Sequence, residues 1–155
     1  MEPFERVVQE HGRVVLRVCR AVVGEDAAQD AWSETFLAAL VAYPRLRPGS
    51  DVRAWLVTIA HRKAVDLLRA QARRPVPVAE PPPVTTGEHP GDGRQDLWAA
   101  VAALPGKQRL CVAYHHFAGL PHAEVAALVG GTPAAARRAA ADGIATLRRT
   151  WKDAS

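Results

Sequence analysis

A proline-rich segment in the middle of the chain most constrains what the protein can fold into. Residues 75–93 read PVPVAEPPPVTTGEHPGDG, with six of the twelve prolines and no Lys or Arg. Proline fixes its own backbone angle and lacks an amide donor, so neither a helix nor a central strand can run through this segment. Since it also has little to bury, it is typical of an extended, mobile linker. The sequence therefore predicts two modules, residues 1–74 and 94–155, joined by an acidic linker.

The composition of both modules predicts helices. Alanine is abundant, and no stretch shows the alternating Val, Ile and Thr of a half-buried strand. We therefore expect an all-α fold. The net charge is +4, divided as about +3, −3 and +4 between the first module, the linker and the second module. Such a basic helical protein favours an anionic partner, most commonly nucleic acid. Because no stretch approaches about 18 uninterrupted apolar residues and no signal-peptide pattern opens the chain, we expect no membrane insertion and a cytoplasmic protein.

The first module is predicted to hold three helices. An apolar stripe runs to about residue 23, where Gly24 ends the helix. The second helix follows the acidic pair Glu25-Asp26 and carries Ala31, Phe36, Leu37, Leu40 and Val41 before it ends ahead of Pro44. After a loop with two prolines, Ser50 or Asp51 can cap a third helix that reaches residue 74.

The third helix has two different sides. One is apolar at helical spacing, through Leu56, Ala60, Ala64 and Leu67. The other is mainly basic and carries, at the same spacing, Thr58, Arg62, Asp66, Arg69 and Arg73. A helix anchored on one side and cationic on the other suits a phosphate backbone. The alternative is a solvated surface helix whose Arg62, Asp66 and Arg69 pair with one another.

The second module contains a helix-turn-helix pattern. Two helices are predicted over residues 97–104 and 107–117. A short helix then starts at Pro121, Gly130-Gly131 supplies the turn, and Thr132 caps a longer helix that begins at Pro133. The small side chains of Ala126 and Ala136 would let the last two helices cross closely. The alternative is an ordinary helical hairpin.

Three stretches together resemble one known family. They are DAWSETFLAAL (residues 30–40), VRAWLVTIAHRKAVDLLR (52–69) and LPGKQRLCVAYHHFAGLPHAEVAALVGGTPAAARRAAADGIATLRR (104–149). In order and spacing they resemble the sigma-70 family of bacterial RNA polymerase sigma factors, in its small two-domain extracytoplasmic-function (ECF) group. The resemblance implies a transcription initiation factor that binds core RNA polymerase and directs it to promoter DNA, with no cofactor and no catalysis of its own.

The resemblance also implies a different role for each of the two modules. Residues 1–74 would be sigma region 2, which binds core polymerase and recognises and melts the −10 element, and residues 94–155 would be sigma region 4, which binds the −35 element. An anti-sigma factor is implied as a further partner. The residues implied for polymerase binding are Asp30, Glu34 and Phe36. Those implied for DNA binding are Tyr43, Arg45, Arg47, Arg53, His61, Arg62, Lys63 and Arg69 in the first module, and Thr132, Arg137 and Arg138 in the second.

Two of these assignments have independent interpretations from the residues. Asp30 and Glu34 form an acidic pair one turn apart with no basic partner at helical spacing, so they favour a positive partner or simply a solubility face. Tyr43 is the nearest side chain that could stack on a flipped base, but it can equally be a core residue at the end of its helix.

The chain departs from the family pattern at two places. His61-Arg62 stands where these proteins usually have Arg-Asn, so an asparagine that reads a base is missing. The recognition helix reads Ala134-Ala135-Ala136 and then Ala139-Ala140-Ala141-Asp142, where the family usually has basic and hydroxyl residues. Since each bidentate side chain contributes about 1–3 kcal/mol of base discrimination, we expect weak, shape-dependent or partner-assisted −35 recognition.

Other constellations are less specific. Cys111, His115, His116 and His122 lie close in sequence, but no second spaced pair completes a tetrahedral metal site, so we expect structural histidines. Cys19 and Cys111 are expected to be reduced core residues, and no catalytic set is recognisable. Two rivals to the sigma-factor interpretation are a stand-alone, dimeric helix-turn-helix regulator and a sigma-like interaction protein that reads DNA poorly.

Overall fold

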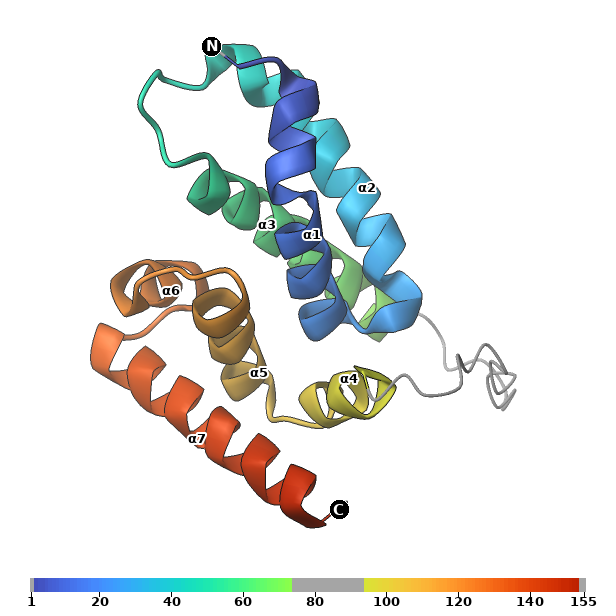
Figure 1. Ribbon diagram of the computed structural model, residues 1–155, viewed down its shortest axis with the longest axis vertical. Coiled ribbons are helices and arrows are strands. Elements are labelled where there is room, and N and C mark those ends of the chain that lie inside the picture. The colour runs from blue at the N-terminus through green and yellow to red at the C-terminus, as the bar shows by residue number, and fades with distance from the viewer. Residues whose placement is uncertain (1, 74–93, 154–155) are drawn as a thin grey trace.

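The computed structural model describes residues 2–73 and 94–153 (Figure 1). Helices make up nearly all of these residues, and no strand occurs among them, so the all-α prediction is confirmed. The segment expected to be a linker, residues 75–93, lies outside the described residues.

The first module consists of α1 (Phe4–Val23), α2 (Glu25–Ala42), the short 3-10 turn η1 (Tyr43–Arg45) and α3 (Val52–Arg73). Gly24, at φ 86°, makes the sharp connection between α1 and α2, which run antiparallel (Figure 1). Only glycine adopts that backbone angle without strain. At the start of α3, the Asp51 carboxylate accepts a hydrogen bond of 3.1 Å from the backbone amide of Ala54, which confirms Asp51 as a capping residue.

In the first module, α2 packs into the core through its small side chains rather than its large apolar ones. The side chains that α2 buries are mainly small and recur at helical spacing, at Ala28, Ala31, Thr35 and Ala39. Phe36 joins them, whereas Leu37, Leu40 and Val41 are 64%, 51% and 79% exposed. Of the five apolar residues noted in this helix, only Ala31 and Phe36 are therefore part of the core. Small side chains let α2 approach α1 and α3 closely, and that contact turns the larger residues outward.

The second module comprises α4 (Arg94–Ala102), α5 (Gly106–Val112), the π-helical turn η2 (Ala113–Phe117), α6 (His122–Val129) and α7 (Pro133–Asp153). The predicted helix over residues 107–117 is thus interrupted, because the Ala118 amide donates to the carbonyl of Ala113, five residues back.

The helix-turn-helix unit is confirmed in detail. Gly130 and Gly131 have φ of 89° and 92° and form the turn between α6 and α7. The Thr132 hydroxyl caps α7 by accepting a 3.0 Å hydrogen bond from the amide of Ala135. Ala126 and Ala136 are both buried where the two helices meet.

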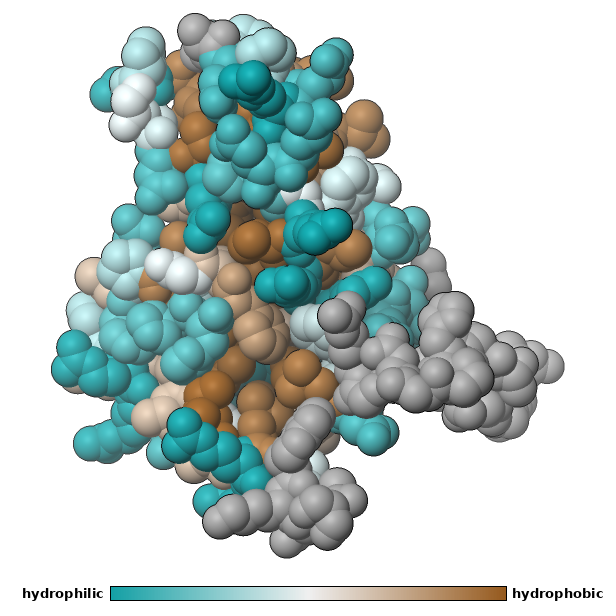
Figure 2. All heavy atoms as spheres, in the orientation of Figure 1, coloured by the Kyte–Doolittle hydropathy of each residue, from teal (hydrophilic) through white to brown (hydrophobic). Residues whose placement is uncertain are grey.

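The two modules pack against each other. The C-terminal half of α1 lies against η2, α4 and α5, and α3 faces α6 across the waist of the molecule (Figure 1). Hydrophilic side chains cover most of one face, while hydrophobic atoms show at the waist and between the helices of the second module (Figure 2). No helix in the described ranges is long and apolar enough to cross a membrane.

Candidate nucleic-acid interface

The basic side of α3 is exposed for most of its length. Arg62, Asp66, Arg69 and Arg73 all lie on the surface, while Thr58 is half-buried and donates its hydroxyl proton to the Ala54 carbonyl. In the part of the chain that the structure describes, Asp66 makes no ion pair with Arg62 or Arg69. The alternative of a self-paired surface helix is therefore not seen, and both guanidinium groups are available to an anion.

The loop before α3 adds further cations next to this face. Arg45 and Arg47 precede the helix, Arg53 lies in its first turn, and all three are exposed. The loop turns at Gly49, with φ 83°, and the Ser50 hydroxyl donates to the carbonyl of Arg47 at 2.7 Å. These local bonds hold the loop arginines beside the N-terminus of α3.

Tyr43 is engaged inside the first module. Its ring meets the Phe4 ring edge-on at a centroid distance of 5.3 Å and lies 6.3 Å from the Trp55 ring, and its hydroxyl donates to the carbonyl of Glu2. The structure thus favours the core interpretation of Tyr43 over a free stacking platform.

His61 and Lys63 do not share the exposed basic face. Lys63 points toward α2, with its ammonium 3.9 Å from the Glu34 carboxylate. His61 turns toward the second module, where its Nδ1 lies 2.5 Å from the hydroxyl of Tyr114. Adjacent positions on a helix are about 100° apart, so the run His61-Arg62-Lys63 distributes its three side chains over three surfaces.

A cleft of about 480 Å³ separates α3 from α6. The α3 side is lined by Ala54, Trp55, Thr58, His61 and Arg62, and the opposite side by Leu120, Glu124, Ala127 and Leu128. The N-terminal half of α3 therefore looks onto the second module on this side, and an acid, Glu124, lines the same cleft.

The second basic surface is at the start of α7. Thr132, Arg137 and Arg138 are exposed. With Lys107 and Gln108 of α5, Thr132 and Arg138 line a groove of about 510 Å³. The Lys107 ammonium lies 3.3 Å from where a Cβ on Gly131 would stand, so it sits against the turn. Lys107 was not predicted as a site residue from the sequence. Its place in α5, the helix before the helix-turn-helix unit, is the signal that could have pointed to it.

A third surface runs along α2. Asp30, Glu34, Leu37 and Val41 follow one another at spacings of four, three and four, so this face is acidic at one end and apolar at the other. Asp30, Glu34 and Leu37 also line a groove of about 380 Å³ shared with Lys63 and Asp66 of α3. Phe36, predicted to face a partner, is only 6% exposed and packs against the Trp32 ring at 4.6 Å. Leu37, Leu40 and Val41 provide the exposed apolar surface instead.

Comparison with known proteins identifies the chain. Residues 7–74 match the family model Sigma-70 region 2, and residues 94–147 match Sigma-70, region 4. The ECF RNA polymerase sigma factor SigC of Mycobacterium tuberculosis is 33% identical over 84% of this chain and 71% of its own length. RNA polymerase sigma factor CarQ of Myxococcus xanthus is 30% identical over 95% of this chain and 88% of its own. The chain belongs to the sigma-70 family, in its ECF group. This sigma factor is therefore a transcription initiation factor that directs promoter recognition by RNA polymerase.

Solved structures show the same fold. The chain is similar to CnrH in its complex with the cytosolic domain of CnrY, with a TM-score of 0.66 and 24% identity over 98% of this chain and 89% of that one. It is also similar to the sigma factor RpoE in complex with the anti-sigma factor NepR from Bartonella quintana, with a TM-score of 0.71 and 21% identity over 96% and 98% of the two chains.

The histidines of the second module of this sigma factor stack among themselves. The His115 and His122 rings are parallel within 20° at 3.8 Å, and the Nδ1 atom of His115 lies 2.8 Å from the Leu120 carbonyl. No group of three potential metal ligands comes together in residues 2–73 and 94–153. Cys19 and Cys111 are free and buried, as predicted for core thiols, and burial raises the pKa of Cys19 to about 12.

Proposed function

We propose that this sigma factor divides its work among three surfaces. The α2 face docks on core polymerase, α3 with its preceding loop captures the opened −10 strand, and the start of α7 sits on duplex DNA at the −35 element. The observation that carries this proposal is the basic side of α3, where exposed arginines without an ion-pair partner among the described residues follow one another along the helix. Two more arginines, Arg45 and Arg47, precede the helix.

The α2 face is suited to a protein partner. An exposed apolar patch bordered by exposed acids marks an interaction site. Leu37, Leu40 and Val41 supply the apolar area, and Asp30 with Glu34 supplies charge for a basic partner. Lys63 offsets part of the Glu34 charge from across the groove. We therefore replace Phe36 by these three residues in the polymerase-binding set and move Lys63 from the DNA-binding set to this groove.

The −10 strand requires both charge and an accessible base pocket. Arg45, Arg47 and Arg53 would contact the backbone of the flipped strand, and Arg62 and Arg69 would continue that path along α3. His61 stands where an asparagine is usual, and its ring can offer one donor and one acceptor to a base edge once it is free of Tyr114.

The −35 contact should be weak. Arg137 and Arg138 are the only long cations in the first two turns of α7, and the surrounding alanines offer no hydrogen bonds to base edges. Lys107 adds a phosphate contact from α5, close to the capped N-terminus of α7. Binding there would depend on backbone contacts and DNA shape more than on direct reading of bases.

Partners and place of action follow from this role. Catalysis of RNA synthesis belongs to the polymerase, and the sigma factor supplies recognition only. It acts in the cytoplasm, where the bacterial polymerase and chromosome are. An anti-sigma factor is a further proposed partner, since the similar RpoE of Bartonella quintana is bound to one.

Run-off transcription with purified core polymerase and a library of promoter fragments tests the proposal. Initiation above that of core alone, lost in a Leu37→Glu/Val41→Glu variant, would support it. A matched control is Ala99→Glu/Ala102→Glu, which adds the same two negative charges on the exposed side of α4. Binding to core without initiation would instead favour an interaction protein, and operator binding without core would favour a stand-alone regulator.

A further inference from the structure

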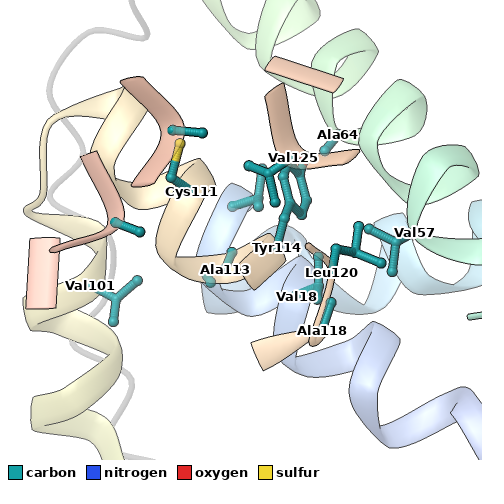
Figure 3. Close-up of a cluster of buried hydrophobic side chains, with 14 of the residues drawn as sticks. Val18, Val57, Ala64, Val101, Cys111, Ala113, Tyr114, Ala118, Leu120 and Val125 are labelled. Carbon is teal, nitrogen blue, oxygen red and sulfur yellow. The ribbon is translucent and has the colours of Figure 1, made fainter. Parts of the chain in front are cut away.

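Three histidines in the second module meet where the chain turns into the helix-turn-helix unit. His115 and His116 belong to η2, and His122 is the first residue of α6. The turn between them is anchored by Leu120, which points into the buried hydrophobic cluster (Figure 3). We call residues 115–122 the elbow. Its geometry fixes where α6 begins.

The His115 and His122 rings join the two sides of the elbow. They are parallel within 20°, with their centroids 3.8 Å apart. Nδ1 of His115 lies 2.8 Å from the Leu120 carbonyl, which can only accept, so this nitrogen carries a proton. Nδ1 of His122 is buried without a hydrogen-bond partner among the described residues, so a proton on it would have no acceptor. The arrangement therefore suits a neutral His122, with its single proton on Nε2.

The charges around the elbow also favour neutral histidines. The charged and titratable side chains that lie around it are Arg20 of α1, Arg53 and His61 of α3, Glu124 of α6, and Arg137 and Arg148 of α7. Most of these are cations. Glu124 makes no ion pair with a histidine in the part of the chain that the structure describes. Burial, and then the charges of His115 and Arg137, lower the pKa of His122.

We propose that the elbow is a pH-sensitive joint that sets the position of the helix-turn-helix unit. With neutral rings, the His115–His122 stack holds the start of α6. Protonation of both rings places two positive charges 3.8 Å apart, at the positive end of the α6 dipole and near Arg137, so the rings separate. The start of α6 then loosens, and α7 loses its fixed contact with α6 at Ala126 and Ala136.

Lowering the pH weakens the stack, because the folded elbow binds protons less readily than the loosened one. The stack contributes its full stability above the ordinary histidine pKa of about 6.5, and this contribution decreases as the pH falls below that value. His116 lies edge-on to His115 at 4.8 Å, and burial, followed by neighbouring positive charges, lowers its pKa as well. The effect of the joint on promoter recognition rests on the proposed −35 role of α7, whereas the joint itself does not.

Amide hydrogen exchange tests the joint without any DNA. We expect the protection of the α6 amides, corrected for the intrinsic effect of pH on exchange, to fall about fivefold or more between about pH 7.5 and 5.5 in the wild type. His122→Phe keeps a flat ring for stacking and removes the titration, so it should reduce this change to about twofold or less. His61→Gln removes the titrating histidine of α3 and is the matched control, which should keep most of the wild-type change.

Two results would overturn the joint. One is an equal pH dependence of α6 protection in the wild type and in His122→Phe, and the other is a wild-type α6 whose protection does not change with pH. His122→Gln is the second variant, in case the phenylalanine ring is not accommodated. Its side chain neither stacks as a ring nor titrates, so its α6 should be weakly protected at both pH values.

Run-off transcription with core polymerase tests the effect of the joint on promoter recognition. The readout is the ratio of initiation on a promoter with a −35 element to initiation on one without it, which cancels the response of the polymerase itself to pH. We expect this ratio to fall about two- to threefold between about pH 7.5 and 6 in the wild type and to stay constant in His122→Phe. A constant wild-type ratio together with a loosened α6 would overturn the effect on recognition. A ratio near one at every pH would instead refute the −35 role of α7, while hydrogen exchange would still decide whether the joint exists.

Discussion

The two helices proposed to contact DNA, α3 and α7, differ in their surface charge and in what lies opposite them. The α3 helix carries an ample set of cations, and its N-terminal half looks onto the second module on one side. The α7 helix is freely exposed at its start, but alanine occupies most of the positions that could reach a base. The exposed cations are thus concentrated on the first module. We therefore expect the α3 face to contribute more to promoter binding than the start of α7 does.

The largest expected effect comes from removing the cations of α3. Arg62→Ala with Arg69→Ala should lower run-off transcription on the order of 100-fold, because each guanidinium–DNA contact contributes about 1–3 kcal/mol. Binding to core polymerase should be unchanged, since these residues lie off the α2 face. Arg13→Ala with Arg17→Ala, two exposed arginines of α1, is the matched control. Equal losses in both variants would mean that only overall charge matters.

Removing a cation from α7 should matter less. Arg138→Ala is expected to reduce transcription about five- to tenfold on a promoter with a −35 element and hardly at all on one without it. Lys107→Ala should weaken binding to all sequences alike and lower the salt dependence of binding by about one counterion. A loss from Arg138→Ala as large as that from the α3 variant would contradict the contrast between the two helices.

Adding a cation to α7 tests the same contrast between α3 and α7 in the opposite direction. Ala134 is exposed in the first turn of the helix. Ala134→Lys is expected to strengthen binding to duplex −35 DNA about three- to tenfold, because it supplies a phosphate contact that the wild type lacks. The measurement is fluorescence anisotropy with the duplex at two salt concentrations. Ala102→Lys, on the exposed side of α4, should leave the affinity unchanged.

Lowering the pH should modestly weaken the packing of the two modules against each other. Burial is the main reason that the pKa of His61 is lowered; a hydrogen bond with the Leu128 backbone acts against this, and the charge of Arg62 adds to it. The form in which the two modules are packed together therefore disfavours protonated His61. The contribution of neutral His61 to the stability of that form is complete above the ordinary pKa of about 6.5 and decreases as the pH falls below that value. Small-angle X-ray scattering should show that the fraction of molecules with separated modules rises about two- to fivefold when the pH is lowered from about 7.5 to about 5.5.

The charged side chains around His61 are Arg62 on its own helix and Glu124 across the cleft. His116 and His122 also have lowered pKa values, chiefly through burial, and both belong to the second module. The variant His61→Gln separates the contribution of His61 from those of the other histidines. It should reduce the pH dependence of module separation and leave only the part that the other histidines cause. An unchanged pH dependence in that variant would assign the effect to the second module alone.

Much of the fold was predictable because its signals are local. Gly24 and Gly130-Gly131 end the helices before them at positive φ, and Asp51 and Thr132 cap the helices that follow them. The alternating sides of α3 were also predictable, since Leu56 and Ala60 are buried while Arg62 and Arg69 are exposed.

The rest depended on contacts that no local pattern encodes. The α2 helix has apolar residues all round, so only packing decides that Ala31 and Ala39 turn inward while Leu37 and Val41 turn outward. The family resemblance implied DNA binding for Lys63 and His61, whereas their side-chain contacts in the structure, with Glu34 and Tyr114, are made to other helices. A hint was present in the surplus of apolar residues on α1, since Val18 and Val22 exceed what a three-helix core needs.

Energy transfer between dyes on the two modules is the most direct measurement. Cysteines at Gln9 on α1 and Ala145 on α7 are exposed, whereas the native Cys19 and Cys111 are buried and react slowly. We predict high transfer in the free protein, because the second module packs against the first. Low transfer in the free protein would contradict that packing.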